Sequence, residues 1–124
     1  MSTLNGGPGI VKDSLVIGSR QTNIIPSATV SNYLNSWHYW SFVIIQSTFQ
    51  VKVYVDSVLI VTFQCVDWGT IAQNGSTAIS IGSYLSGTLF FYNGSIANMQ
   101  VYNKALIDTE VNQNYIALKG RFGL

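Results

Sequence analysis

Hydrophobic and polar positions alternate with a period of two along the middle of the chain. Gln50–Asp56 is the clearest case, because three valines fall on one face and polar or aromatic residues on the other. The preceding His38–Gln46 is longer and more apolar, as is typical of a central strand, and Ser47-Thr48 is the turn expected between the two. Val58–Phe63 then continues the pattern. We predict antiparallel strands joined by tight turns.

The second half of the chain carries weaker strand patterns and one helical pattern. Ala78–Gly82 is predicted as a short strand, and Thr88–Tyr92 and Ser95–Tyr102 flank Asn93-Gly94, a strong hairpin signal. Only Leu106–Leu118 has apolar residues at helical spacing.

The limits of this helix follow from capping residues. Asp108 is predicted to be the N-cap, with Glu110 in the first turn, and Gly120 is predicted to end the helix. A short amphipathic helix of this kind is expected to seal one edge of a sheet.

Together these elements predict an all-β fold, an antiparallel β-sandwich in the form of a compact jelly roll, with one short C-terminal helix. The Gly- and Pro-rich start predicts a flexible arm over residues 1–9, and residues 10–124 form a single β-sandwich domain.

Composition narrows the class of protein. Hydrophobic residues make up 48% of the 124 residues and the net charge is +1, which excludes a natively disordered chain. No apolar run reaches the ~20 residues that span a bilayer. The polar Met1–Gly9 start predicts no signal peptide, and the single cysteine, Cys65, excludes an internal disulfide. The balanced charge gives no reason to expect nucleic acid or a membrane as a partner.

The low charge content changes this picture. Charged residues are 9% of the chain, against about 25% in ordinary soluble domains. A neutral, polar exterior limits self-repulsion and suits a chain packed beside copies of itself. The alternative is a β-rich protein whose Ser, Thr and Asn surface carries no such role.

The residues that catalysis needs do not gather in the sequence. A glycosidase uses two carboxylates that flank the scissile bond, but Glu110 is the only glutamate and the aspartates are scattered near turns and strand ends. The aspartates are Asp13, Asp56, Asp67 and Asp108. His38, the only histidine, falls inside a predicted strand, so a Ser-His-Asp device is not expected. We predict no enzyme, no cofactor and no metal site. Calcium held by Asp, Asn and backbone oxygens stays an alternative, although no Asp-x-Asp-type loop supports it.

Aromatic residues are the remaining candidates for ligand binding. They are Trp37, Tyr39, Trp40, Trp68, Tyr84, Phe90, Phe91 and Tyr92. An exposed set could stack on sugar rings, whereas a buried set would serve core packing and oligomer contacts, which we favour. Trp37 and Trp40 are three apart and cannot share one strand face. Two glycosylation sequons, at Asn74 and Asn93, are interpreted as turn sequences.

Several motifs carry a resemblance to a known family. They are Trp37-His38, Tyr54-Val55-Asp56-Ser57, Ile81-Gly82, Asn93-Gly94-Ser95-Ile96 and Val101–Leu106 with Glu110-Val111. In this order they resemble the second half of the laminin G-like, concanavalin A-type jelly roll. The ends Gly6–Val16 and Tyr115–Leu124 are similar to those of laminin G-like structural proteins of tailed phages, especially cyanophages.

The chain also departs from that family. Ser57 stands where the family has Gly, Ile107 where it has the capping Ser, and Asn98 where an Asp is common. The family domain is longer, with several strands in the region between Val16 and Trp37. If those strands are lost, a sheet edge or apolar face stays exposed, and a neighbouring subunit is expected to cover it.

The resemblance implies a function. It predicts a non-enzymatic virion structural protein on the particle surface, a small capsid decoration (cement) protein of a tailed phage. Its sheet edges and N-terminal arm would bind copies of itself and other virion proteins such as the major capsid protein. It would be made in the host cytoplasm. The alternative is a lectin-like module of a phage tail or fibre that binds glycan.

Overall fold

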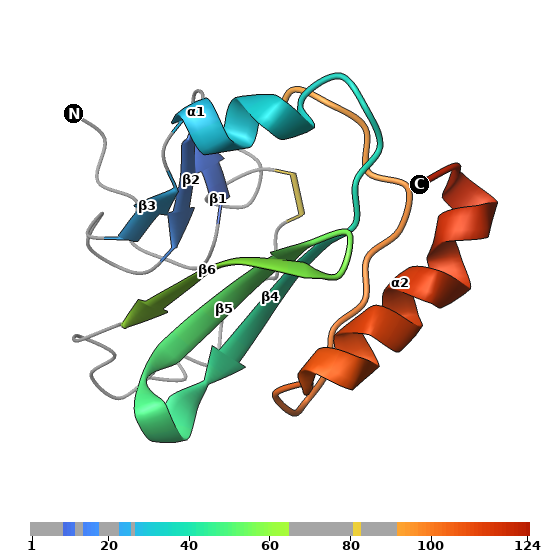
Figure 1. Cartoon of the computed structure of the whole chain (residues 1–124). Helices are drawn as coiled ribbons and strands as arrows, with labels where there is room; N and C mark the ends of the chain where they lie inside the picture. Colours follow the sequence, from blue (N-terminus) through green and yellow to red (C-terminus); the bar gives the residue numbers. More distant parts are fainter. Residues whose placement is uncertain (1–8, 12–13, 18–22, 26, 65–80, 83–91) are drawn as a thin grey trace. The chain divides into compact units, whose positions relative to one another are not determined.

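The computed structural model describes residues 9–11, 14–17, 23–25, 27–64, 81–82 and 92–124 (Figure 1). The chain divides into two units, Met1–Trp68 with Val101–Leu124, and Gly69–Gln100. In the described part of the first unit, two three-stranded antiparallel sheets form, with helices between and after them. No helix in these ranges is long and apolar enough to cross a bilayer.

The first sheet consists of very short strands. They are β1 (Gly9–Val11), β2 (Ser14–Ile17) and β3 (Asn23–Ile25), paired in the order β1-β2-β3. Gly9 pairs with Val16, and Leu15 with Ile25. Strands of three or four residues are too short to show a period, so the sequence analysis did not find them. Residues 1–8 of the predicted arm lie outside the described residues, and Gly9 is already in a strand.

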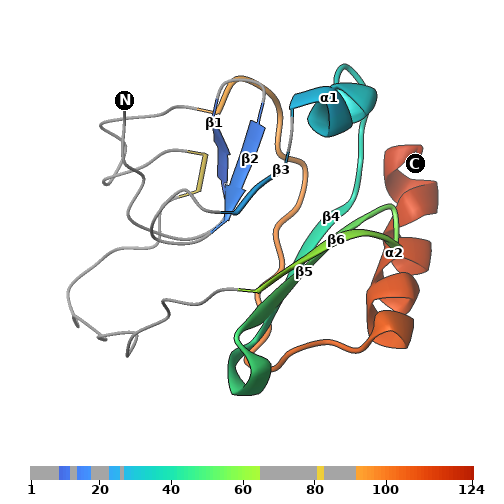
Figure 2. The same ribbon diagram turned by 60° about the vertical axis from the view of Figure 1, so that its left-hand side comes forward.

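The second sheet confirms the alternating pattern of the middle of the chain. It consists of β4 (Trp40–Ile45), β5 (Gln50–Val55) and β6 (Val58–Gln64), with β5 in the centre (Figure 1; Figure 2 shows the same strands from another side). A 3-10 turn, η2 (Gln46–Thr48), joins β4 to β5, close to the predicted turn. β4 begins two residues after the predicted start, so His38 and Tyr39 precede the strand.

One face of this sheet packs against a short helix that the sequence analysis missed. Val51 and Val53 of β5 are fully buried together with Val30 of α1 (Ser27–Val30). Partly buried side chains surround them, namely Trp40, Phe42, Ile60, Val61 and Phe63. The prediction of a single helical segment was therefore wrong, because α1 and the 3-10 turn η1 (Ser31–Tyr33) are shorter than any periodic pattern can reveal.

The opposite face packs against the C-terminal helix. α2 (Asp108–Phe122) places Val111 against Val43 and Tyr54, and all three side chains are buried. The prediction of a helix here is confirmed, but its position at a sheet edge is corrected: α2 covers a face. Both faces of β5 are thus occupied, which explains why Tyr54, on the polar side of the pattern, is 1% exposed.

The limits of α2 also differ from the prediction. The helix runs through Gly120 and ends at Gly123, whose φ is +69°. The Leu124 N–H donates to the Lys119 carbonyl at 3.0 Å. A helical glycine costs only about 1 kcal/mol, whereas Gly123 takes the left-handed conformation that closes a helix.

The second unit is described at residues 81–82 and 92–100. Ile81 and Gly82 lie in a bend, and the Tyr92 N–H donates to the Gly82 carbonyl at 2.8 Å. The predicted strand Ser95–Tyr102 was wrong, because these residues have no regular secondary structure and Ile96 and Met99 are half exposed. The predicted strands Ala78–Gly82 and Thr88–Tyr92 lie mostly outside the described residues.

The short region between Val16 and Trp37 contains regular secondary structure of its own. It holds β3, α1 and η1, and Val30 at the end of α1 is 1% exposed against the valines of β5. Part of the apolar face that was expected to lie open is covered from within the chain.

Candidate functional site

The β5–β6 turn has a strained backbone and a well-placed carboxylate. Asp56 and Ser57 have φ of +50° and +67°, and two successive positive φ angles are what a type I′ hairpin turn requires. The Asp56 N–H donates to the Tyr39 carbonyl at 2.9 Å, and the Tyr39 N–H donates to Asp56 Oδ1 at 2.9 Å. The turn is thereby tied to the segment that enters β4.

The same carboxylate begins a chain of side-chain hydrogen bonds. Asp56 Oδ2 lies 2.7 Å from His38 Nδ1, and His38 Nε2 lies 2.7 Å from Ser36 Oγ. We call these three residues the Ser36–His38–Asp56 triad. The side chains of His38 and Asp56 are 18% and 29% exposed, and Ser36 is open to solvent. The Tyr33 ring meets the imidazole edge-on at 5.2 Å.

This arrangement corrects the expectation that His38 lies inside a strand. Because β4 begins at Trp40, His38 lies in the approach to the sheet and faces the hairpin turn. The signal that could have found it is the register: Trp40 pairs with Val55, so Tyr39 and Asp56 come next at that end of the sheet.

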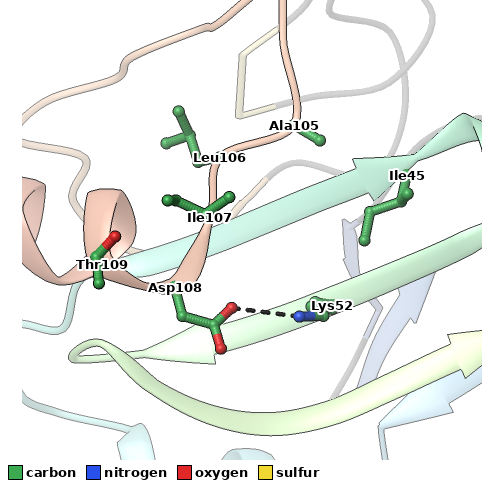
Figure 3. A pocket seen from close by; sticks show the side chains of 7 residues that line it. All are labelled: Ile45, Lys52, Ala105, Leu106, Ile107, Asp108 and Thr109. Carbon is green, nitrogen blue, oxygen red and sulfur yellow. Dashed lines mark hydrogen bonds and ion pairs between the residues drawn. The ribbon is translucent and has the colours of Figure 1, made fainter.

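A second polar cluster lies where α2 meets the sheet. Asp108 Oδ1 accepts from Lys52 Nζ at 3.2 Å (Figure 3). The same oxygen accepts from the Tyr54 hydroxyl at 2.6 Å. The hydrogen bonds from Tyr54 and Lys52 lower the pKa of Asp108. Burial, and then the bond to Asp108, raises the pKa of Tyr54. The hydrogen bond to Asp108 raises the pKa of Lys52.

Asp108 is not the N-cap that the sequence predicted. Ile107 holds that position, and Asp108 is the first helical residue with its carboxylate turned to the sheet. The Ile107 N–H donates to Glu110 Oε2 at 3.0 Å, but the isoleucine side chain cannot accept a bond in return. Lys104 pairs with Glu110 Oε1, and this ion pair lowers the pKa of Glu110.

A shallow hollow of about 480 Å³ lies beside this cluster. Its lining residues are Ile45, Lys52, Ala105, Leu106, Ile107, Asp108 and Thr109 (Figure 3). The lining is mostly apolar, and its two charged side chains are paired with each other. The hollow therefore presents a concave, mostly apolar surface to a ligand, but no unpaired charge.

The aromatic candidates separate into core and surface. Trp40 stacks on Phe42, with ring centroids 6.3 Å apart, and meets Tyr33 edge-on at 5.5 Å, so it belongs to the core. Trp37 is 49% exposed, as expected for two tryptophans that cannot share one face. Tyr39 lies near Tyr115, and Tyr92 is half exposed. The remaining candidates lie outside the described residues: Trp68, Tyr84, Phe90 and Phe91.

Each described carboxylate has its own partner. Asp56 pairs with His38, Asp108 with Lys52 and Tyr54, and Glu110 with Lys104. Within the described ranges no three His, Cys, Asp or Glu side chains gather as a metal site would require. Asp13, Asp67 and Cys65 lie outside these ranges.

Comparison with known families decides the fold family. A laminin G-type family model, described as the concanavalin A-like lectin/glucanases superfamily, matches residues 11–112. The chain belongs to this superfamily. A search of curated proteins gave no match.

One solved structure shows the same fold. It is an S-layer domain-containing protein (residues 221–444) from Clostridium thermocellum ATCC 27405, with 8% identity and a TM-score of 0.55. The alignment covers 82% of this chain and 50% of that one, so this concanavalin A-like chain spans half the length of its structural relative. Identity this low supports the fold alone.

Proposed function

We propose that this concanavalin A-like domain is a non-catalytic structural protein that assembles with copies of itself and with other proteins of a particle. The observation that carries the proposal is the number of large apolar side chains on the surface. Val101, Val58 and Ile107 are 76%, 64% and 63% exposed, and more large apolar residues are exposed than buried among the described residues. Exposed apolar side chains mark interfaces where they gather into a contiguous patch.

Two further features support assembly. With 9% charged residues and a net charge of +1, copies of the chain repel one another weakly. The separate pairing of Asp56, Asp108 and Glu110 supports a role without glycosidase chemistry, which uses two carboxylates on one bond.

The specific role that we propose is decoration of a tailed-phage capsid. The resemblance of both chain ends to laminin G-like virion proteins supports it, and the particle surface would then be its location. The partners would be the chain itself and the major capsid protein, without nucleic acid or membrane.

Two measurements test this proposal. Light scattering of the purified chain at micromolar concentration is expected to give an oligomer, and a stable monomer would contradict self-assembly. In purified particles, the copy number is expected to approach that of the shell protein. A handful of copies would instead place the chain in a tail.

A glycan-binding module is the second candidate. Trp37 favours it, because a half-exposed indole directly after the turn at Asn35 and Ser36 combines an apolar face with hydrogen-bonding groups. Binding on a glycan array that is lost in Trp37→Ala but kept in Phe49→Ala would support it. Phe49 is a suitable control because it is 47% exposed at the other end of β4.

A further inference from the structure

The structural role proposed above makes no use of the Ser36–His38–Asp56 triad. We propose that Ser36 is an activated nucleophile that reacts with acyl and phosphonyl electrophiles, with His38 as its general base and Asp56 as the positioning residue. A nucleophile within hydrogen-bond reach of a base, which a third group orients, is the arrangement that activates serine.

The hydrogen bonds assign the protons. An ionised carboxylate can only accept, so the bond to Asp56 Oδ2 requires His38 Nδ1 to carry hydrogen. In the neutral ring, Nε2 then has a free lone pair, and it lies 2.7 Å from Ser36 Oγ. The Ser36 hydroxyl therefore donates to the base that would take its proton.

The backbone holds the base in place. Asp56 Oδ1 accepts from the Tyr39 N–H at 2.9 Å, which fixes the carboxylate on the side of the imidazole. The Tyr33 ring, edge-on at 5.2 Å, limits the rotation of that imidazole. Ser36 is exposed, so an electrophile can approach it from solvent.

The reaction balances with an external electrophile. With a fluorophosphonate, the Ser36 Oγ–P bond forms as the P–F bond breaks, fluoride leaves, and the serine proton passes to His38 Nε2 and then to solvent. With an activated ester, Oγ attacks the carbonyl, the alcohol leaves with the proton from His38, and an acyl-serine remains.

The direct test is labelling of the folded chain with a fluorophosphonate probe, followed by peptide mass spectrometry. We expect the label on Ser36 and not on Ser47, which is exposed in η2 at the other end of β4. Protein that is heat-denatured before the probe is added should not be labelled. Equal labelling of both serines, or none on Ser36, would overturn the proposal.

Variants separate activation from folding. Ser36→Ala should lose the label and Ser47→Ala should keep it. Asp56→Asn keeps a side chain that tolerates positive φ but reverses the hydrogen bond to the imidazole, so labelling should slow on the order of a hundredfold with the fold intact by circular dichroism.

Chemical rescue separates a general base from a structural residue, because added imidazole can replace a missing base but not a missing structural contact. His38→Ala should label slowly, and added imidazole should restore the rate, because free imidazole replaces the base without rebuilding the hydrogen bond to the turn. If imidazole has no effect, or if His38→Ala and Asp56→Asn label at the wild-type rate, the triad is a structural clamp only and the proposal fails.

Discussion

At the scale of single residues, the β5–β6 turn is where the chain departs most clearly from its own conformational preference. Ser57 has φ of +67°, a conformation that costs a residue with a Cβ roughly 1–2 kcal/mol. Ser57→Gly removes this cost but adds freedom to the unfolded chain, so we expect a gain of about 0.5–1 kcal/mol in the free energy of unfolding. Urea denaturation measures it.

The matched control is the same substitution outside the left-handed region. Ser47 lies in η2 and is not among the described residues with positive φ, so Ser47→Gly should lower the free energy of unfolding. A loss of stability in Ser57→Gly would show that the turn is not the source of strain.

Asp108 makes stability depend on pH. The bonds from Tyr54 and Lys52 hold its pKa below the ordinary value of 3.8, so its contribution is complete above that value and is lost as the pH falls through the folded-state pKa. We expect the difference in unfolding free energy between wild type and Asp108→Asn to shrink on acidification. Urea titrations over a series of acidic pH values measure it, and a difference that is constant with pH would refute the assignment.

At the scale of elements, α2 has an incomplete N-terminal cap. Ile107 is 63% exposed at the N-cap, and Glu110 already accepts from its N–H. Ile107→Ser would complete the capping box with little loss of buried apolar surface. We expect the free energy of unfolding to rise by about 1 kcal/mol relative to wild type.

The control for this prediction is Ile116→Ser. Ile116 is also exposed, at 52%, but it lies inside α2 where serine caps nothing. Thermal unfolding should show a gain for Ile107→Ser and none for Ile116→Ser, and equal effects would mean that the change acts through hydrophobicity alone.

How much of the fold could be predicted depends on the length of each element. β4, β5, β6 and α2 are long enough for a period to show, and the sequence predicted all four. α1 has four residues, and its contribution is one side chain, Val30, whose partners Val51 and Val53 lie more than twenty residues away. No local pattern reveals a contact of this kind.

The site was predicted less well, and for a related reason. Composition located the carboxylates and the histidine but not their partners, which the fold supplies. The contact between His38 and Asp56 depends on the register of β4 against β5, and that of Asp108 with Tyr54 depends on which face of the sheet α2 covers. The predicted N-cap at Asp108 was wrong because Tyr54 and Lys52 bind that carboxylate instead.

At the scale of the whole molecule, the low charge content predicts that the proposed self-assembly does not depend on ion pairs. Apolar contacts and uncharged polar groups are little affected by screening, whereas ion pairs at a surface weaken with salt. With 9% charged residues, self-association is expected to persist in high sodium chloride and to strengthen in sulfate, which favours burial of apolar surface. Sedimentation at low and high ionic strength measures this, and dissociation by sodium chloride would point to an electrostatic interface instead.

A pair of lysine substitutions tests whether exposed apolar residues form that interface. Val101 is 76% exposed and Asn103 is exposed close by, both in irregular backbone of the first unit. Val101→Lys would place a charge in an apolar contact, so we expect association to weaken at least about tenfold, or 1.4 kcal/mol. Asn103→Lys adds the same charge to a polar position and should leave association nearly unchanged. Equal weakening by both would mean that net charge, and not the apolar surface around Val101, controls assembly.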